Sequence, residues 1–100
     1  MPRARRVDSN QKLIVETLRA GGARVIITSG VGSIGGHLSG FPDIVIGYSG
    51  RTILGEIKTP AGKLTEAEHD FMTEWTRRGD DYVILRSVED VLSLLTALRE

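Results

Sequence analysis

Two acidic residues and one lysine stand at the ends of two strand-like runs that a turn separates. The first run, DIVIGY, begins at Asp43, and the second, RTILGEIK, contains Glu56 and Lys58. Between them, Ser49-Gly50 is typical of a two-residue hairpin turn, which places Asp43 directly opposite Glu56. Because side chains alternate along a strand, Lys58 shares a face with Glu56. The pattern therefore predicts two carboxylates and one ammonium group on the same face of a hairpin.

Such a group of side chains points to chemistry on phosphate esters. Opposed carboxylates, with Cβ atoms about 4.5 to 5.5 Å apart, repel each other unless a positive charge offsets them. Mg²⁺ or Mn²⁺ would supply that charge, because hard divalent ions bind one or two carboxylates together with water and phosphate oxygens. Lys58 would stabilise charge on a phosphoryl transition state or orient a water molecule. The alternative is that Glu56 and Lys58 are solvated strand charges and that Asp43 only marks a strand start.

Seven elements are predicted around this hairpin, in the order α-β-β-β-α-β-α. Their boundaries follow from apolar periodicity, β-branched runs and capping residues. Helices are predicted from Ser9 or Asn10 to residue 20, over 64–79 and over 87–99, and strands over 24–28, 43–48, 51–58 and 81–86. The fold class is therefore α/β, with a mixed central sheet flanked by helices.

Composition restricts what the chain can be. Its 100 residues predict a single domain over 1–100, with a basic, flexible arm over 1–8. Basic and acidic residues balance at 13 each, so affinity for nucleic acid requires a local patch. The absence of cysteine excludes disulfides and thiolate metal sites and suits a reducing cytoplasm. No apolar run approaches the roughly 20 residues of a membrane span, so we expect a cytoplasmic protein without membrane contact.

Gly30, Gly32 and Gly35 spell G-x-G-x-x-G directly after an apolar run, which is the fingerprint of a dinucleotide site. That fingerprint needs a helix to begin at its last glycine. The residues that follow, GGHLSGFPD, contain further glycines and a proline, so a helix is not expected there and the dinucleotide interpretation fails. We expect instead a flexible substrate loop, whose backbone approaches the metal site ahead of Asp43.

The motifs G-F-P-D, G-E-I-K and K-L-T-E-A-E follow one another on a strand, a strand and a helix. In this order they resemble the PD-(D/E)xK nuclease superfamily, and specifically a small stand-alone VRR-NUC domain, over about residues 36–95. The resemblance implies a restriction-endonuclease-like core, with Asp43, Glu56 and the carbonyl of Ile57 as metal ligands. It further implies that Lys58 is the catalytic lysine and that Glu16 is the acidic residue of the first helix. Members are Mg²⁺- or Mn²⁺-dependent endonucleases acting on structured DNA, and the short viral ones resemble homodimeric junction resolvases.

Two positions need separate interpretation. Glu68 stands where the family usually carries Gln, and it also follows Thr65 at the spacing of a capping box. Glu16 falls well away from the apolar side of its helix, as a solvated residue does. Both a site role and an ordinary structural role are therefore open for Glu68 and Glu16.

We expect the chain to act as a symmetric homodimer, because severing both strands of a junction requires two sites related by a two-fold axis. Phe71, Met72 and Trp75 on one helix, and a leucine stripe on the last, exceed what one thin sheet covers. A catalytically idle DNA-binding or assembly module with the same fold is the alternative function. The presence of Asp43, Glu56 and Lys58 favours the enzyme.

Overall fold

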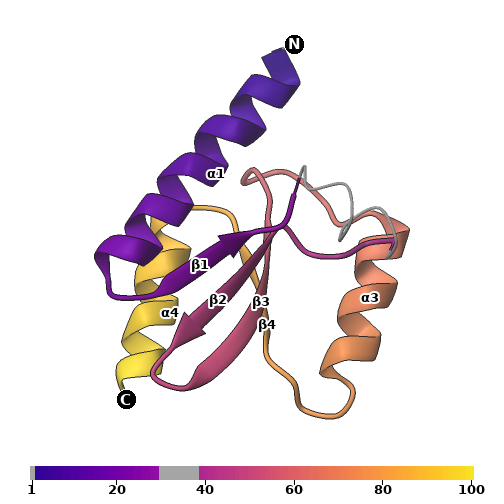
Figure 1. Ribbon diagram of the computed structural model, residues 1–100. Coiled ribbons are helices and arrows are strands. Elements are labelled where there is room, and N and C mark those ends of the chain that lie inside the picture. Colours follow the sequence, from indigo (N-terminus) through magenta and orange to yellow (C-terminus); the bar gives the residue numbers. More distant parts are fainter. Residues whose placement is uncertain (1, 30–38) are drawn as a thin grey trace.

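The computed structural model describes residues 2–29 and 39–100, and its one four-stranded sheet has helices on both faces (Figure 1). The elements follow one another in the predicted order. The helices are α1 (Pro2–Ala20), α3 (Glu66–Thr76) and α4 (Val88–Arg99), and the strands are β1 (Arg24–Ile27), β2 (Ile44–Tyr48), β3 (Arg51–Ile57) and β4 (Tyr82–Leu85). The predicted α/β class and mixed sheet are therefore confirmed. Most of the predicted substrate loop, at residues 30–38, lies outside the described residues.

The sheet has the strand order β1-β2-β3-β4. Strands β1 and β3 are each antiparallel to β2, whereas β3 and β4 run parallel. Tyr48 pairs with Arg51, so the predicted hairpin register is confirmed. Ser49, with φ of 47°, and Gly50, with φ of 83°, have the positive values that a type I′ turn requires. The parallel pairing brings the carboxyl ends of β3 and β4 to the same edge of the sheet.

Alternating side chains give the sheet two different faces. One face packs on α1 and α4 and forms the apolar core. Its fully buried side chains are Ile14, Leu18, Ile44, Ile46, Ile53, Leu85 and Val91. On the other face lie Leu54 and Glu56, and α3 covers that side of the sheet in Figure 1. The core therefore lies between the sheet and helices α1 and α4, and the side chain of Glu56 lies on the side of α3.

Helix α1 differs from the prediction at its beginning. It begins at Pro2 rather than at Ser9 or Asn10, so the segment predicted as a flexible arm is helical from residue 2. Proline suits the first position of a helix, and the arginine and alanine residues that follow are good helix formers. Asn10 consequently lies inside the helix, and its side chain hydrogen-bonds to the end of β3 instead of capping α1.

Helix α4 begins where its capping residue predicts. Ser87 accepts a hydrogen bond from the N–H of Asp90 at 3.2 Å. Val91 and Leu95 are buried, but Leu92 is 52% exposed, so only part of the predicted apolar stripe reaches the core.

Within residues 2–29 and 39–100, no helix is both long enough and apolar enough to cross a lipid bilayer.

Gly40 brings the segment that enters β2 against the first turn of α3. Its φ is 81°, which a residue with a side chain rarely adopts. A Cβ at this position would overlap the carbonyl group of Ala67 and lie 2.8 Å from the backbone nitrogen of Glu68. Conformation and space therefore both require glycine, and the close approach sets the start of α3 beside the segment that carries Asp43.

We expect Gly40→Ala to destabilise the protein more than Gly50→Ala does. Both positions have positive φ, which costs alanine about 1 kcal/mol, but nothing lies within 4 Å of a Cβ added at Gly50. The backbone overlap at Gly40 adds about 1–3 kcal/mol, the usual cost of overpacking. Urea unfolding of both variants measures the difference in unfolding free energy. Equal losses would show that the approach of Gly40 to α3 contributes nothing.

Candidate active site

Asp43 is fixed by the segment after β1 and by the end of β3. Its backbone carbonyl accepts hydrogen bonds from the N–H groups of Thr28 at 2.8 Å and Ser29 at 3.2 Å. The hydroxyl of the buried Thr28 donates to the carbonyl of Pro42. The carboxylate of Asp43 accepts from the N–H of Ile57, with 2.9 Å between Oδ2 and the nitrogen. Backbone and side chain are therefore both held at the point where β2 begins.

Glu56 has a buried carboxyl group, and one of its two oxygens accepts no hydrogen bond from the described residues. Its side chain is 2% exposed, and its Oε1 has no hydrogen-bond partner in the part of the chain that the structure describes. Burial, followed by the charge of Asp43 and the contact with Glu68, raises the pKa of Glu56 from 4.5 to about 9. Glu56 therefore carries a proton at neutral pH in the metal-free protein.

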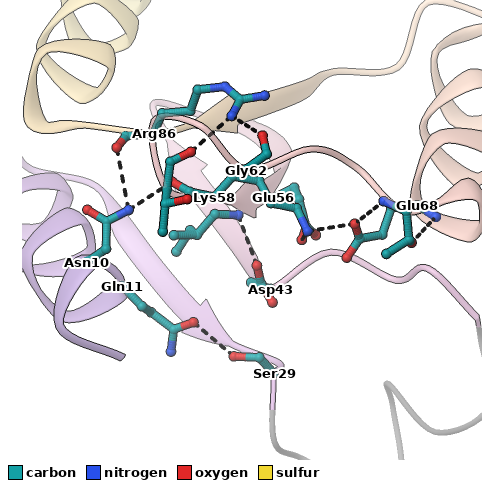
Figure 2. A network of polar contacts seen from close by, with 12 residues as sticks. Asn10, Gln11, Ser29, Asp43, Glu56, Lys58, Gly62, Glu68 and Arg86 are labelled. Atoms are coloured by element: carbon teal, nitrogen blue, oxygen red, sulfur yellow. Dashed lines mark hydrogen bonds and ion pairs between the residues drawn. The ribbon is translucent and has the colours of Figure 1, made fainter. Parts of the chain in front are cut away.

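Lys58 contacts the carboxyl groups of Glu68 and Glu56. Its Nζ lies 2.7 Å from Oε1 of Glu68 and 3.5 Å from Oε2 of Glu56 (Figure 2). Burial lowers the pKa of Lys58, but the hydrogen bond and charge of Glu68, together with the charge of Glu56, outweigh it and raise the pKa overall. The ammonium group is therefore charged and held between β3 and the start of α3.

Glu68 caps α3 and also contacts Lys58. The N–H of Thr65 donates to Oε1 of Glu68 at 2.8 Å, and the N–H of Glu68 donates to the Thr65 hydroxyl at 3.1 Å, which confirms the capping box. The same Oε1 binds Lys58. Burial raises the pKa of Glu68, but the hydrogen bonds from Lys58 and Thr65 lower it overall. Glu68 therefore caps the first turn of α3 and connects this turn to Lys58.

The predicted ligand Ile57 has a suitable backbone direction. Its N–H points to Asp43, and the N–H and C=O of one strand residue face the same edge, so its carbonyl also lies on the side of Asp43. Glu16 is different, because it is exposed on α1 two residues after the buried Ile14, which puts it on the other side of the helix. The structure thus groups the hairpin residues, and a site role for Glu16 stays a prediction.

Tyr82 is a site residue that sequence reasoning missed. Its hydroxyl is buried and has no hydrogen-bond partner among the side chains and backbone groups that the structure describes. Burial, followed by the charges of Glu56, Glu68 and Asp43, raises the pKa of Tyr82, so the hydroxyl keeps its proton. Tyr82 pairs with Leu54 in the parallel β3–β4 ladder. Because α3 separates these two strands in the sequence, the position of Tyr82 beside β3 follows from the strand pairing and not from a local sequence pattern.

The hairpin residues fit a hard divalent cation. Glu56 offers a buried oxygen without a partner among the described residues, and the carboxylate of Asp43 lies close enough to raise the pKa of Glu56. Mg²⁺ commonly takes one or two carboxylates and keeps several waters. Among the side chains that the structure describes, those of residues 9–29 and 39–100, no three His, Cys, Asp or Glu are grouped so that they could hold a metal ion. Two carboxylates and the Ile57 carbonyl would therefore leave part of the coordination to water and substrate.

Comparison of the chain with protein-family models, with curated proteins and with solved structures finds no match. The functional interpretation consequently rests on the side chains themselves. These are the carboxyl groups of Asp43 and Glu56, the ammonium group of Lys58, which lies 3.5 Å from Oε2 of Glu56, and the buried hydroxyl of Tyr82.

We expect the metal-free protein to lose stability as the pH rises from about 5 to about 9. Folded Glu56 has a pKa of about 9, above its ordinary 4.5, so the folded chain keeps a proton that the unfolded chain releases in this range. The stability contributed by this proton is fully present below pH 4.5 and is lost as the pH approaches 9. Glu56→Gln cannot ionise and removes the loss.

Melting temperatures in EDTA measure this effect. Across the range the wild-type value should fall by about 5 °C or more, since 1 kcal/mol shifts a domain of this size by about 4–8 °C. Glu74→Gln, an exposed substitution on α3, is the control and should keep the wild-type slope. The same slope in wild type and Glu56→Gln would contradict the assignment of the effect to Glu56.

Proposed function

We propose that the protein is a metal-dependent endonuclease of the VRR-NUC type, which hydrolyses phosphodiester bonds in structured or branched DNA. One observation carries the proposal: Asp43, Glu56 and Lys58 meet where β2 begins and β3 ends, around a Glu56 oxygen that has no partner among the described residues. The mixed sheet with helices on both faces supports a restriction-endonuclease-like core. In such a core the strand ends of the hairpin carry the reaction.

Each residue has a separate task in the proposed reaction. Asp43, Glu56 and the carbonyl of Ile57 would hold Mg²⁺ or Mn²⁺, which when bound acts as a Lewis acid on a phosphate oxygen. Glu56 would release its proton to solvent on becoming a ligand, because burial and the charge of Asp43 keep it protonated in the metal-free protein. Lys58 directs its ammonium group at the negative charge that develops on the phosphate. Glu68 holds that ammonium group in place before substrate arrives.

The basic beginning of α1 supports a phosphate-rich substrate. Asn10 reaches the carbonyl of Lys58, so the turns that carry Arg3, Arg5 and Arg6 lie about 6–10 Å further along the helix axis. Helix α1 extends past the sheet at its N-terminal end in Figure 1. We propose that these turns bind the DNA backbone, as a local patch on a chain whose net charge is +0.

Exposed apolar side chains support a homodimer. Ile26 on the edge strand β1 is 62% exposed, and Leu13 and Leu92 are 50% and 52% exposed. Over residues 66–76, α3 has no buried residue, although its Phe71 and Trp75 stack on each other. Apolar side chains left in water by so small a chain are candidates for an interface. Light scattering at micromolar concentration, with and without DNA, tests the dimer.

A cleavage assay tests the proposed activity. Linear duplex, flapped and four-way-junction DNA are each incubated with the protein in Mg²⁺, Mn²⁺ or EDTA. We expect cleavage with either metal, none in EDTA, and faster cleavage of branched than of linear DNA. The double variant Asp43→Asn/Glu56→Gln, purified in parallel, controls for contaminating nucleases. DNA binding without cleavage in any metal would instead favour the catalytically idle DNA-binding module.

A further inference from the structure

We propose that Asn10 and Arg86 are positioning residues, which fix the backbone of Lys58 and thereby the direction of its ammonium group. Asn10 comes from α1, and Arg86 follows β4, so both are distant from Lys58 in the sequence. The proposal rests on the proposed function, since the direction of the ammonium group affects a rate only if Lys58 acts on substrate.

Asn10 binds the backbone of Lys58 directly. Its Nδ2 donates to the Lys58 carbonyl oxygen at 2.8 Å and lies 3.4 Å from the carbonyl oxygen of Arg86 (Figure 2). The N–H of Lys58 donates to the carbonyl of Leu85 at 3.1 Å. Both polar backbone groups of Lys58 are therefore bound, one by α1 and the other by the end of β4.

Arg86 binds the segment that follows Lys58. Its Nη1 donates to the carbonyl of Thr59 at 3.0 Å and to that of Gly62, and it lies 3.4 Å from that of Pro60. The backbone N–H of Arg86 donates to Oδ2 of Asp90 at 2.8 Å, in the first turn of α4. A guanidinium group has only donors, which suits a cluster of carbonyl oxygens. Arg86 thus ties residues 59–62 to the start of α4.

These bonds matter because Lys58 lies just beyond a strand end. Strand β3 ends at Ile57, and ends of elements open most readily when few contacts hold them. Glu68 and Glu56 hold the tip of the lysine side chain, but a bound cation or phosphate would compete for the same charges. The hydrogen bonds from Asn10 and Arg86 hold the backbone of residues 58–62 even when the Lys58 ammonium group changes partners. Misplacing a catalytic group by 1 Å costs about 100-fold in rate.

The first readout is amide hydrogen exchange of residues 58–62 in the metal-free protein. We expect exchange in this segment to rise about tenfold or more in Asn10→Ala, Asn10→Asp and Arg86→Ala. Asn10→Asp keeps the shape of the side chain but removes the amide donor, so it separates hydrogen bonding from packing. Arg86→Lys keeps the charge but not the guanidinium fork, and we expect an intermediate result.

The second readout is the steady-state kinetics of junction cleavage in Mg²⁺. We expect kcat to fall about tenfold or more in Asn10→Asp and Arg86→Ala, with KM changed less than about threefold, because binding groups are intact. Thr17→Ala and Arg51→Ala are the controls. The Thr17 hydroxyl donates to the carbonyl of Leu13 within α1, and Arg51 pairs with Asp81 at the other end of the hairpin.

Several results would overturn the proposal. Wild-type exchange and kcat in Asn10→Asp would show that the amide donor has no positioning role. A loss of kcat equal to that of the two control variants would show a merely structural effect. So would a loss of kcat that correlates across the variants with melting temperature rather than with amide hydrogen exchange in residues 58–62. If wild type cleaves no DNA in any metal, the proposed function fails, whereas unchanged exchange in the variants refutes the positioning by itself.

Discussion

Replacing Asp43 with Asn or Glu56 with Gln is expected to abolish metal-dependent DNA cleavage while leaving the protein folded. Each substitution removes one of the two negative charges that would hold the cation, and amides are poor replacements for carboxylates as ligands of Mg²⁺. Local structure should survive, because the amide of Asp43→Asn still accepts the hydrogen bond that the Ile57 N–H donates at 2.9 Å. Alanine at this position would leave that N–H unsatisfied, at a cost of about 1–3 kcal/mol.

The two substitutions should differ in their effect on stability. Glu56 is buried and its pKa is about 9, so Glu56→Gln removes a group whose ionisation opposes folding at high pH. We expect Glu56→Gln to melt above wild type at pH 8 in EDTA and Asp43→Asn to melt close to it. This contrast distinguishes the cost of burying the Glu56 carboxyl group from a general loss of contacts, which would lower both melting temperatures.

Cleavage of junction DNA, calorimetric titration with Mn²⁺ and thermal melting together measure the outcome. Asp70→Asn, on the exposed surface of α3, is the matched control and should keep wild-type cleavage and metal binding. Cleavage by either site variant at the wild-type rate would remove that carboxylate from the mechanism. Melting temperatures that fall by about 10 °C or more in both variants would mark Asp43 and Glu56 as structural residues.

The hairpin could be read from sequence because its determinants are local. Ser49 and Gly50 tolerate the positive φ of a type I′ turn, and a two-residue turn leaves only one register for the flanking strands. That register alone places Asp43 opposite Glu56. The start of α3 could be predicted from the sequence for the same reason, since Thr65 and Glu68 cap it within a single turn.

The remaining parts of the site depend on contacts that no local pattern specifies. Asn10 was predicted as a cap because its residue type suits one, but the helix continues to Pro2 and the amide instead binds Lys58. Arg86 and Tyr82 reach the site only because β4 pairs in parallel with β3, which is a consequence of how α3 crosses the sheet. Side-chain direction between elements distant in the sequence is set by tertiary packing and not by residue type.

The attachment of Lys58 to Glu68 is such a contact, and it changes what the substitution of Lys58 should do. Without its ammonium group, Glu56 and Glu68 face each other with no cation between them, since Nζ lies 3.5 Å from one and 2.7 Å from the other. A divalent cation would then meet more uncompensated negative charge than in wild type. We therefore expect Lys58→Met to bind Mn²⁺ as tightly as wild type or more tightly.

Turnover should change in the opposite direction in Lys58→Met. Methionine fills nearly the same volume but carries no charge to stabilise the phosphoryl transition state, and removing one such group costs about 10²- to 10³-fold in kcat. Lys63→Met, at an exposed position beyond the segment that Arg86 binds, is the control and should keep wild-type kcat. Retained metal binding with lost turnover would assign Lys58 to the chemical step. A kcat within about twofold of wild type would exclude it from that step, and lost Mn²⁺ binding would mean that the lysine organises the carboxylates rather than acting on phosphate.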